Sequence, residues 1–256
     1  MNKAWKVIVG VLAALLVLLL VAEAGIRMFV ANQITSTYQE QAALQPGVVA
    51  TAEPEVDFGS QPITLGLLGG SFPHMTITTP STLQVNGDEV SGDPAATVVL
   101  DKVRIAGGEP VAESFHVTTE LPNDFLRAVL NHEIRKQIGD NRFLKNVISV
   151  SDVVTNPTDG TFTIMFTSGI AGVELRPSTN GGQLSFTAAS TQLFGVDLPD
   201  GVAEALTGAM AEGMRQEVTG NMQVRDVTVI PGGLRLEMGG SNVNFNELQR
   251  ELRQAY

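Results

Sequence analysis

The sequence has no cysteine, one tryptophan, two tyrosines and three histidines among its 256 residues. Without cysteine, the chain has no disulfide, no thiolate nucleophile and no thiolate ligand for a metal. Basic residues are also scarce, since 16 Lys and Arg stand against 27 Asp and Glu and give a net charge of −11. This excess of acid excludes nucleic-acid binding by bulk charge and a broad cationic face for a membrane surface.

Sequence motifs for catalysis and for metal binding are missing as well. His132-Glu133 begins like a zinc-protease motif, but Lys136 stands where the second histidine is required. Ser71 follows two glycines without forming a nucleophile elbow, and no glycine-rich turn continues into a phosphate-binding Lys-Ser/Thr. We therefore expect no catalytic residue, no metal and no cofactor, and predict that the chain is not an enzyme. A pair of carboxylates brought together by folding would be the exception, as in a hydrolase of lipid or glycan.

An apolar run, Val7–Ala22, is the most distinctive feature that the sequence does have. As a helix it covers roughly 24 Å, and with its continuation to Val30 it is long enough to cross a bilayer. Lys3 and Lys6 precede it, so the positive-inside rule places the N-terminus in the cytoplasm and the rest of the chain outside. The run is either an uncleaved signal anchor or a signal peptide cut after Ala24, which leaves a secreted or periplasmic protein.

The helical pattern continues beyond Ala24, which favours the anchor. Apolar residues recur every fourth position from Ile26 to Ala42, until Gln45-Pro46-Gly47 ends the helix. Glu23 and Arg27 form an i,i+4 pair in the favourable order. We therefore divide the chain into a signal anchor or signal peptide (1–30), a helix extension with a linker (31–55) and an α+β domain (56–256).

The remaining sequence predicts an α+β fold of mostly antiparallel strands wrapped around amphipathic helices. Asn86-Gly87 indicates a hairpin, and Ile63–Leu65 is predicted as a strand before an apolar glycine-rich turn, Gly66–Phe72. Two amphipathic helices are expected. One follows Asn123 and ends at Gly139, and the other opens at Pro199-Asp200.

Apolar side chains at unusual places suggest where a lipid would bind. We expect the helix faces and the strand Thr161–Thr167 to line an apolar groove through Leu126, Leu130, Ile134, Phe162, Phe166, Val202, Leu206, Met210 and Met214. Leu67, Leu68 and Phe72 form either a lid or a tip that enters a membrane, unless the turn folds back onto the core. Arg127, Arg135 and Lys136 lie either on an ordinary solvated face or in a site for an anionic headgroup.

Five segments in order resemble the actinobacterial LmeA-like phospholipid-binding proteins. They are GIRMFVANQI, VDFGSQPITLGLLGGSFPHMTIT, LPNDFLRAVLNHEI, DLPDGVAEALTGAM and VTVIPGGLRLEMGG, and the resemblance covers about residues 20–245. The resemblance implies a fold like the tubular lipid-binding domains. It also implies an envelope protein that binds phospholipid, phosphatidylinositol-type lipid in particular, and supports lipoglycan or lipid assembly.

We therefore expect a single-pass protein of the cell membrane whose C-terminal domain lies outside the cytoplasm. Its expected partners are phospholipid and the membrane, with an envelope glycosyltransferase as a candidate protein partner and no nucleic acid. The first alternative is an adaptor of envelope glycosyltransferases that has a dry core. The second is the hydrolase of lipid or glycan.

Overall fold

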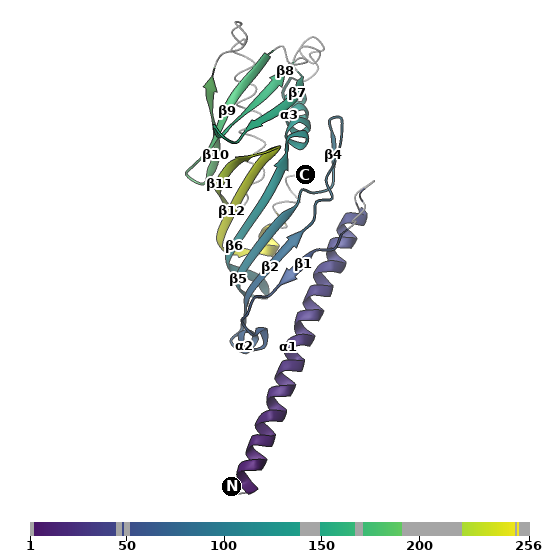
Figure 1. Cartoon of the computed structure of the whole chain (residues 1–256), viewed down its shortest axis with the longest axis vertical. Coiled ribbons are helices and arrows are strands. Elements are labelled where there is room, and N and C mark those ends of the chain that lie inside the picture. Colours follow the sequence, from purple (N-terminus) through teal and green to yellow (C-terminus); the bar gives the residue numbers. More distant parts are fainter. Residues whose placement is uncertain are drawn as a thin grey trace.

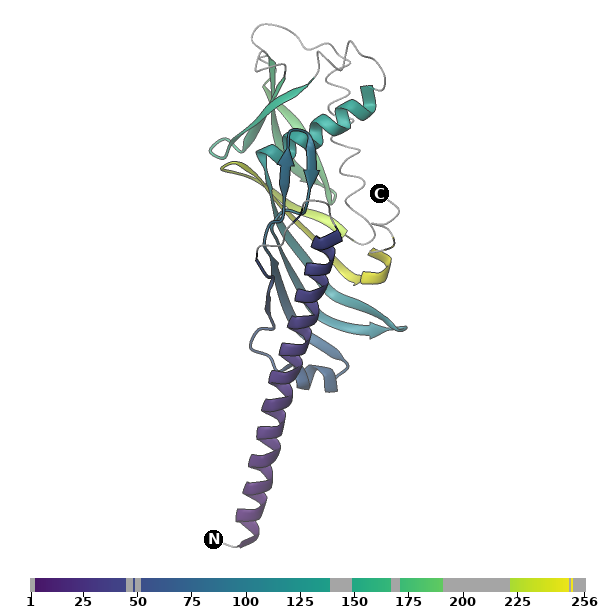
Figure 2. The same cartoon turned by 90° about the vertical axis from the view of Figure 1, so that its right-hand side faces the viewer.

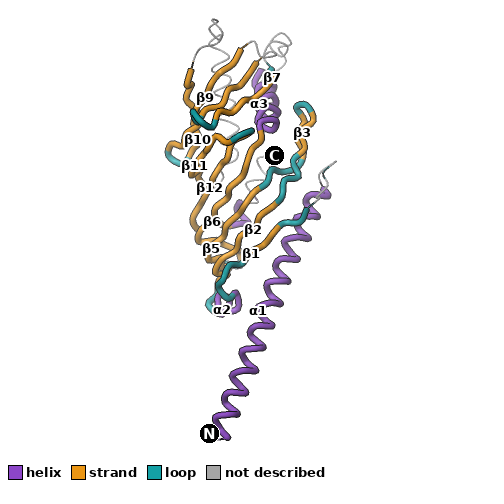
Figure 3. Tube along the Cα trace, viewed as in Figure 1, coloured by secondary structure: helices purple, strands orange, loops and turns teal. Residues whose placement is uncertain are grey.

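The computed structural model of the chain describes residues 3–44, 48, 52–138, 149–166, 171–190, 222–248 and 250. These residues form a mixed α+β fold with antiparallel sheets and a long apolar N-terminal helix, which confirms the predicted class. In chain order the elements are α1 (Lys3–Leu44), β1 (Glu55–Asp57), α2 (Ile63–Leu68), β2 (Ser71–Thr79), β3 (Gln84–Asn86), β4 (Glu89–Ser91), β5 (Ala96–Ala106), β6 (Glu109–Pro122), α3 (Asn123–Ile138), β7 (Val150–Asn156), β8 (Thr161–Phe166), β9 (Ala171–Asn180), β10 (Gln183–Ser190), β11 (Met222–Ile230) and β12 (Gly233–Asn244) (Figures 1 and 3).

The helix α1 is unbroken and extends far beyond the folded body at its N-terminal end (Figure 1). From Leu16 onward it is long and apolar enough to cross a membrane, and the side chains of residues 16–21 are exposed. The predicted apolar stripe of its second half faces the body, since Ile26, Val30 and Ile34 are half-buried and Ala42 is buried. Figure 2 shows this second half running along the side of the body.

Two antiparallel sheets follow one another along the long axis of the molecule (Figure 1). The larger has the strand order β1-β2-β5-β6-β12-β11 and lies nearer to α2, and the smaller has the order β10-β9-β8-β7. The strands β3 and β4 form the hairpin predicted at Asn86-Gly87, with Gly87 in the left-handed region at φ +65°. Most neighbouring strands are also neighbours in sequence, but β12 pairs with β6 across more than a hundred residues.

The described core has two apolar clusters. One, called the α3 cluster here, joins α3 to both sheets and consists of Leu130, Ile134, Val150, Val153, Phe162, Ile164, Phe166, Leu175, Val229 and Leu234. The other covers the larger sheet around Leu100 and Phe115, where the Phe115 ring meets that of Phe245 edge to face. The Asn244 side chain caps the helical turn that begins at Phe245, and its hydrogen bond to Glu109 holds the pKa of that carboxyl below its ordinary value.

The prediction of a strand at Ile63–Leu65 and an apolar turn at Gly66–Phe72 was wrong, except that a turn is present at Gly69-Gly70. Residues Ile63–Leu68 form the helix α2, and the strand β2 begins only at Ser71. Gly66 allows the helix to lie close to the following strand, because a Cβ atom there would approach the Pro73 Cδ atom and the Ser71 carbonyl oxygen to 2.6 Å. The short helix is therefore fixed by its neighbours rather than by its own helix propensity.

Candidate functional site

Five of the predicted groove residues come together at the α3 cluster. Leu130, Ile134, Phe162 and Phe166 are buried in it, and Leu126 packs against it as a partly buried side chain. The helix α3 places its contributions four residues apart, so that they share one face toward the sheet. Val202, Leu206, Met210 and Met214, the other predicted groove residues, lie outside the described residues. The cluster supplies an apolar interior where α3 and the two sheets meet.

The predicted headgroup arginines converge on one carboxylate, that of Asp88 in the β3–β4 hairpin. Arg127 Nη1 lies 3.3 Å from Asp88 Oδ1, and Arg135 Nη2 lies 2.6 Å from Asp88 Oδ2. Arg127 also donates to the Gly87 carbonyl at 2.7 Å. Both arginines are thus already paired with an anion. The side chain of Lys136 lies outside the described part of the chain.

Asn131 stands between the two arginines and is the buried member of this group, with 5% of its surface exposed. Its Nδ2 donates to Asp88 Oδ1 at 2.9 Å and to the Val150 carbonyl at 2.8 Å, and its Oδ1 accepts from the Val150 amide at 2.7 Å. Arg127, Asn131 and Arg135 are spaced by four residues and therefore form one polar stripe on α3. The stripe connects the hairpin to the helix, and Asn131 connects the helix to β7.

Of the three residues predicted as a lid or membrane tip, two lie on α2. Leu67 and Leu68 are exposed there, together with Leu65, which the sequence analysis did not select. Phe72 lies instead in β2, where it is half-buried and pairs in register with Val103 of β5. The exposed apolar surface is thus a helix of leucines, and the phenylalanine belongs to the sheet.

A contact between α1 and the segment around α2 lies at the same end of the body. Glu23 and Arg27 form the predicted pair at 2.7 Å, and Arg27 also donates to the carbonyl oxygens of Gly59 at 3.2 Å and Gln61 at 2.9 Å. The guanidinium lies over the Phe58 ring at 5.7 Å from its centroid. The helix that carries the apolar run is therefore bonded directly to the folded body.

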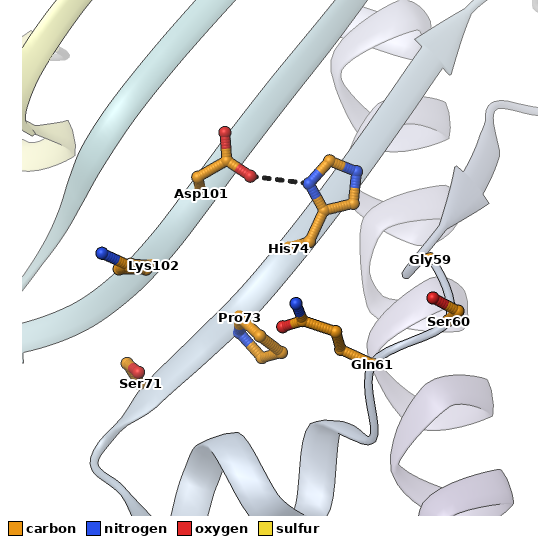
Figure 4. Close-up of a pocket in the computed structure, with 8 residues that line it drawn as sticks. All are labelled: Gly59, Ser60, Gln61, Ser71, Pro73, His74, Asp101 and Lys102. Carbon is orange, nitrogen blue, oxygen red and sulfur yellow. Dashed lines mark hydrogen bonds and ion pairs between the residues drawn. The ribbon is translucent and has the colours of Figure 1, made fainter.

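A polar pocket of about 660 Å³ opens beside this contact (Figure 4). Its lining comes from the loop before α2, from β2 and from β5, and consists of Gly59, Ser60, Gln61, Ser71, Pro73, His74, Asp101 and Lys102. His74 Nδ1 lies 2.7 Å from Asp101 Oδ1, and His74 Nε2 lies 3.2 Å from Thr76 Oγ1. The imidazole is hydrogen-bonded on both sides, which fits a structural histidine. Sequence reasoning missed this pocket, because its polar residues come from three separate segments.

Metal binding has no support in the described part of the chain. There, no group of three or more His, Asp and Glu side chains is placed to hold an ion.

The chain was compared with known protein families, curated proteins and solved structures. A family model described as LmeA-like phospholipid-binding matches residues 21–238, which begin inside α1 and end inside β12. No curated protein and no solved structure matches the chain.

Proposed function

The chain belongs to the LmeA-like phospholipid-binding family, and on that premise we propose that it binds phospholipid at the outer face of the cell membrane, to which α1 anchors it. Phosphatidylinositol-type lipid is the proposed ligand. The proposed role is to present this lipid for assembly of envelope lipoglycan or lipid, with an envelope glycosyltransferase as partner. The family is a lipid-binding family and not a known enzyme family, and we propose no catalytic residue.

The contact of Glu23 with the body is the observation that supports an uncleaved α1, which keeps the protein anchored in the membrane. The Glu23 carboxylate accepts hydrogen bonds from the amides of Ile63 and Thr64, each at 2.9 Å. Cleavage after Ala24 would remove this residue and leave both donors without their partner. The half-buried stripe from Ile26 to Ala42, which cleavage after Ala24 would leave in place, packs the second half of α1 on the body. An attached carrier presents lipid locally and does not shuttle it over long distances.

The α3 cluster is the proposed apolar wall against which the acyl chains bind. Burial of each methylene contributes roughly 0.8 kcal/mol, so a two-chain lipid gains most of its affinity from an apolar interior. We place the headgroup at Arg127, Arg135 and Lys136, where a phosphate would take over the role of the Asp88 carboxylate. Arginine suits that exchange because its planar donors match either anion.

An adaptor with a dry core remains the second candidate, because Phe162 and Ile164 are almost fully buried among protein atoms. Native mass spectrometry of the gently extracted full chain distinguishes the two. The proposal expects a bound phospholipid of inositol type, and it expects Met210→Trp to lose that lipid while the chain stays folded. If the purified chain contains no lipid and transfers none between vesicles, the lipid-binding proposal fails and the adaptor is the function that is left. In a dry core the same substitution costs about 1–3 kcal/mol of stability.

The variant Asp88→Asn tests the headgroup site. It removes the anion that pairs with Arg127 and Arg135, and a solvent-accessible ion pair contributes about 1 kcal/mol or less. We therefore expect the amount of anionic phospholipid that co-purifies with the chain to rise about twofold to fivefold over wild type. In this variant the headgroup no longer has to displace the Asp88 carboxylate from the two arginines. Quantitative lipid analysis of the purified chain measures this ratio.

Asp159→Asn is the matched control, because it makes the same change of charge in an exposed turn between β7 and β8. An equal rise in both variants would assign the effect to net charge. A drop in melting temperature of Asp88→Asn without any gain of lipid would mean that the arginines serve only to hold the hairpin.

A further inference from the structure

The helix α2 exposes three leucines at the end of the body that faces the N-terminal half of α1 (Figures 1 and 2). Leu65, Leu67 and Leu68 are 56%, 40% and 84% exposed, whereas Ile63 is fully buried. Leu65 and Leu68 are three residues apart and share a face of the helix. An apolar group of this kind at one end of a protein marks a surface that contacts an apolar partner.

The side chain of Glu23 fixes α2 beside the membrane helix. It accepts from the amides of Ile63 and Thr64 and from the Thr64 hydroxyl, each at 2.9 Å, so a residue of α1 caps the first turn of α2. Glu23 is also the first charged residue after the apolar run Val7–Ala22. Because α1 contacts the body from Glu23 onward, Lys3–Ala22 is the part of this helix left for the bilayer, and it covers about 30 Å. The helix α2 therefore begins at the level where α1 leaves the hydrocarbon.

The backbone of α2 has internal partners at both ends. Besides the two amides capped by Glu23, the Gly66 amide donates to the Pro62 carbonyl at 3.3 Å. At the other end, the amides of Gly69 and Gly70 donate to the carbonyls of Leu65 and Leu67 at 3.2 and 2.9 Å. The hydrocarbon of a bilayer accommodates a protein backbone only where the amides and carbonyls of that backbone are hydrogen-bonded in this way. The sequence also carries no charged residue between Asp57 and His74, although the chain as a whole is strongly acidic.

We propose that α2 is a second membrane contact, in which Leu65, Leu67 and Leu68 enter the outer leaflet of the bilayer that α1 spans. The occupant is the bilayer because the leucines continue the exposed apolar surface of α1 around residues 16–21. The inference rests on the part of the proposed function in which α1 remains attached. A spanning helix and a shallow one together fix the height and tilt of the body. They hold the polar pocket beside His74 at the level of the lipid headgroups.

Tryptophan fluorescence of the full chain in nanodiscs of phosphatidylcholine and phosphatidylglycerol tests this contact. Trp5→Phe removes the single native tryptophan, and Leu68→Trp then places the probe on α2. Val154→Trp is the matched control, since Val154 is a 49% exposed residue of β7 in the sheet farther from α2 (Figure 1). Lipids brominated on their acyl chains should quench the Leu68→Trp variant several-fold more strongly than the control. Aqueous iodide should show the opposite order.

Two results would overturn the inference. Equal access of iodide to both variants would place α2 in water, and a blue-shifted emission that bromine does not quench would place it against a protein or a second copy. Leu65→Trp in the same background repeats the measurement at a second position on that face. The experiment does not depend on bound cargo, so a chain that retains no phospholipid still gives a reading of the membrane contact.

Discussion

Replacing Phe162 with alanine is expected to lower the free energy of unfolding by about 3–5 kcal/mol. Phe162 is 2% exposed in the α3 cluster, and its ring meets the Phe186 ring edge to face with centroids 5.7 Å apart. The substitution removes the ring and leaves a void that the paired strands β7, β8 and β9 cannot close. Urea denaturation of the detergent-solubilised full chain, followed by circular dichroism, measures the loss.

Val154→Ala on the adjacent strand is the control for the Phe162 variant, and we expect it to change stability by less than about 0.5 kcal/mol. Added phospholipid should restore part of the stability of Phe162→Ala if an acyl chain fills the void, because a ligand that binds only the folded state stabilises it. A loss no larger than that of the control would contradict close packing and would mean that Phe162 already lines an open space.

The elements that the sequence predicts well are those whose signal is local. The spacing of Leu126, Leu130 and Ile134 places one apolar face on α3, and the structure confirms both that helix and the orientation of the face. The Asn86-Gly87 hairpin follows from the need for φ > 0 in a two-residue turn. The stripe from Ile26 to Ala42 likewise depends only on helical periodicity and is confirmed as the side that faces the body.

The helix α2 could not be predicted because its causes lie outside its own sequence. The β-branched pair Ile63-Thr64 and the glycine at position 66 favour a strand or a turn. The helix forms nevertheless, because Glu23, forty residues earlier, accepts the amide hydrogen bonds of its first turn. The missing side chain at Gly66 also allows close contact with β2. Both effects are tertiary, and no local pattern reports them.

The partner of Arg127 and Arg135 was missed for the same kind of reason. Their spacing of eight residues places both on one side of α3, and Asp88 is visible in the sequence within the hairpin turn. Nothing local indicates that the hairpin folds over the helix and brings that carboxylate within 2.6 Å of Arg135. The β12–β6 pairing is equally non-local, and no turn signal joins those two strands.

The largest effect outside the apolar cluster is expected for Asn131→Leu, with a loss of about 2–5 kcal/mol in the free energy of unfolding. Leucine has a similar size but leaves the amide and the carbonyl of Val150, a residue that is 2% exposed, without their hydrogen-bond partners. An unsatisfied buried polar group costs about 1–3 kcal/mol. Urea denaturation measures the total, and faster hydrogen exchange of the Val150 amide would locate the loss at the start of β7.

Arg135→Gln separates the role of the buried amide from that of the ion pair on the same polar stripe. Arg135 is 48% exposed in its contact with Asp88, so its loss should cost less than about 1 kcal/mol and should leave exchange at Val150 unchanged. Equal losses in the two variants would mean that the contact of α3 with the β3–β4 hairpin at Asp88 stabilises the fold as much as the bonds of Asn131 to β7. In that case, an anionic headgroup that displaced Asp88 would also detach the hairpin from the helix that carries the proposed acyl-chain site.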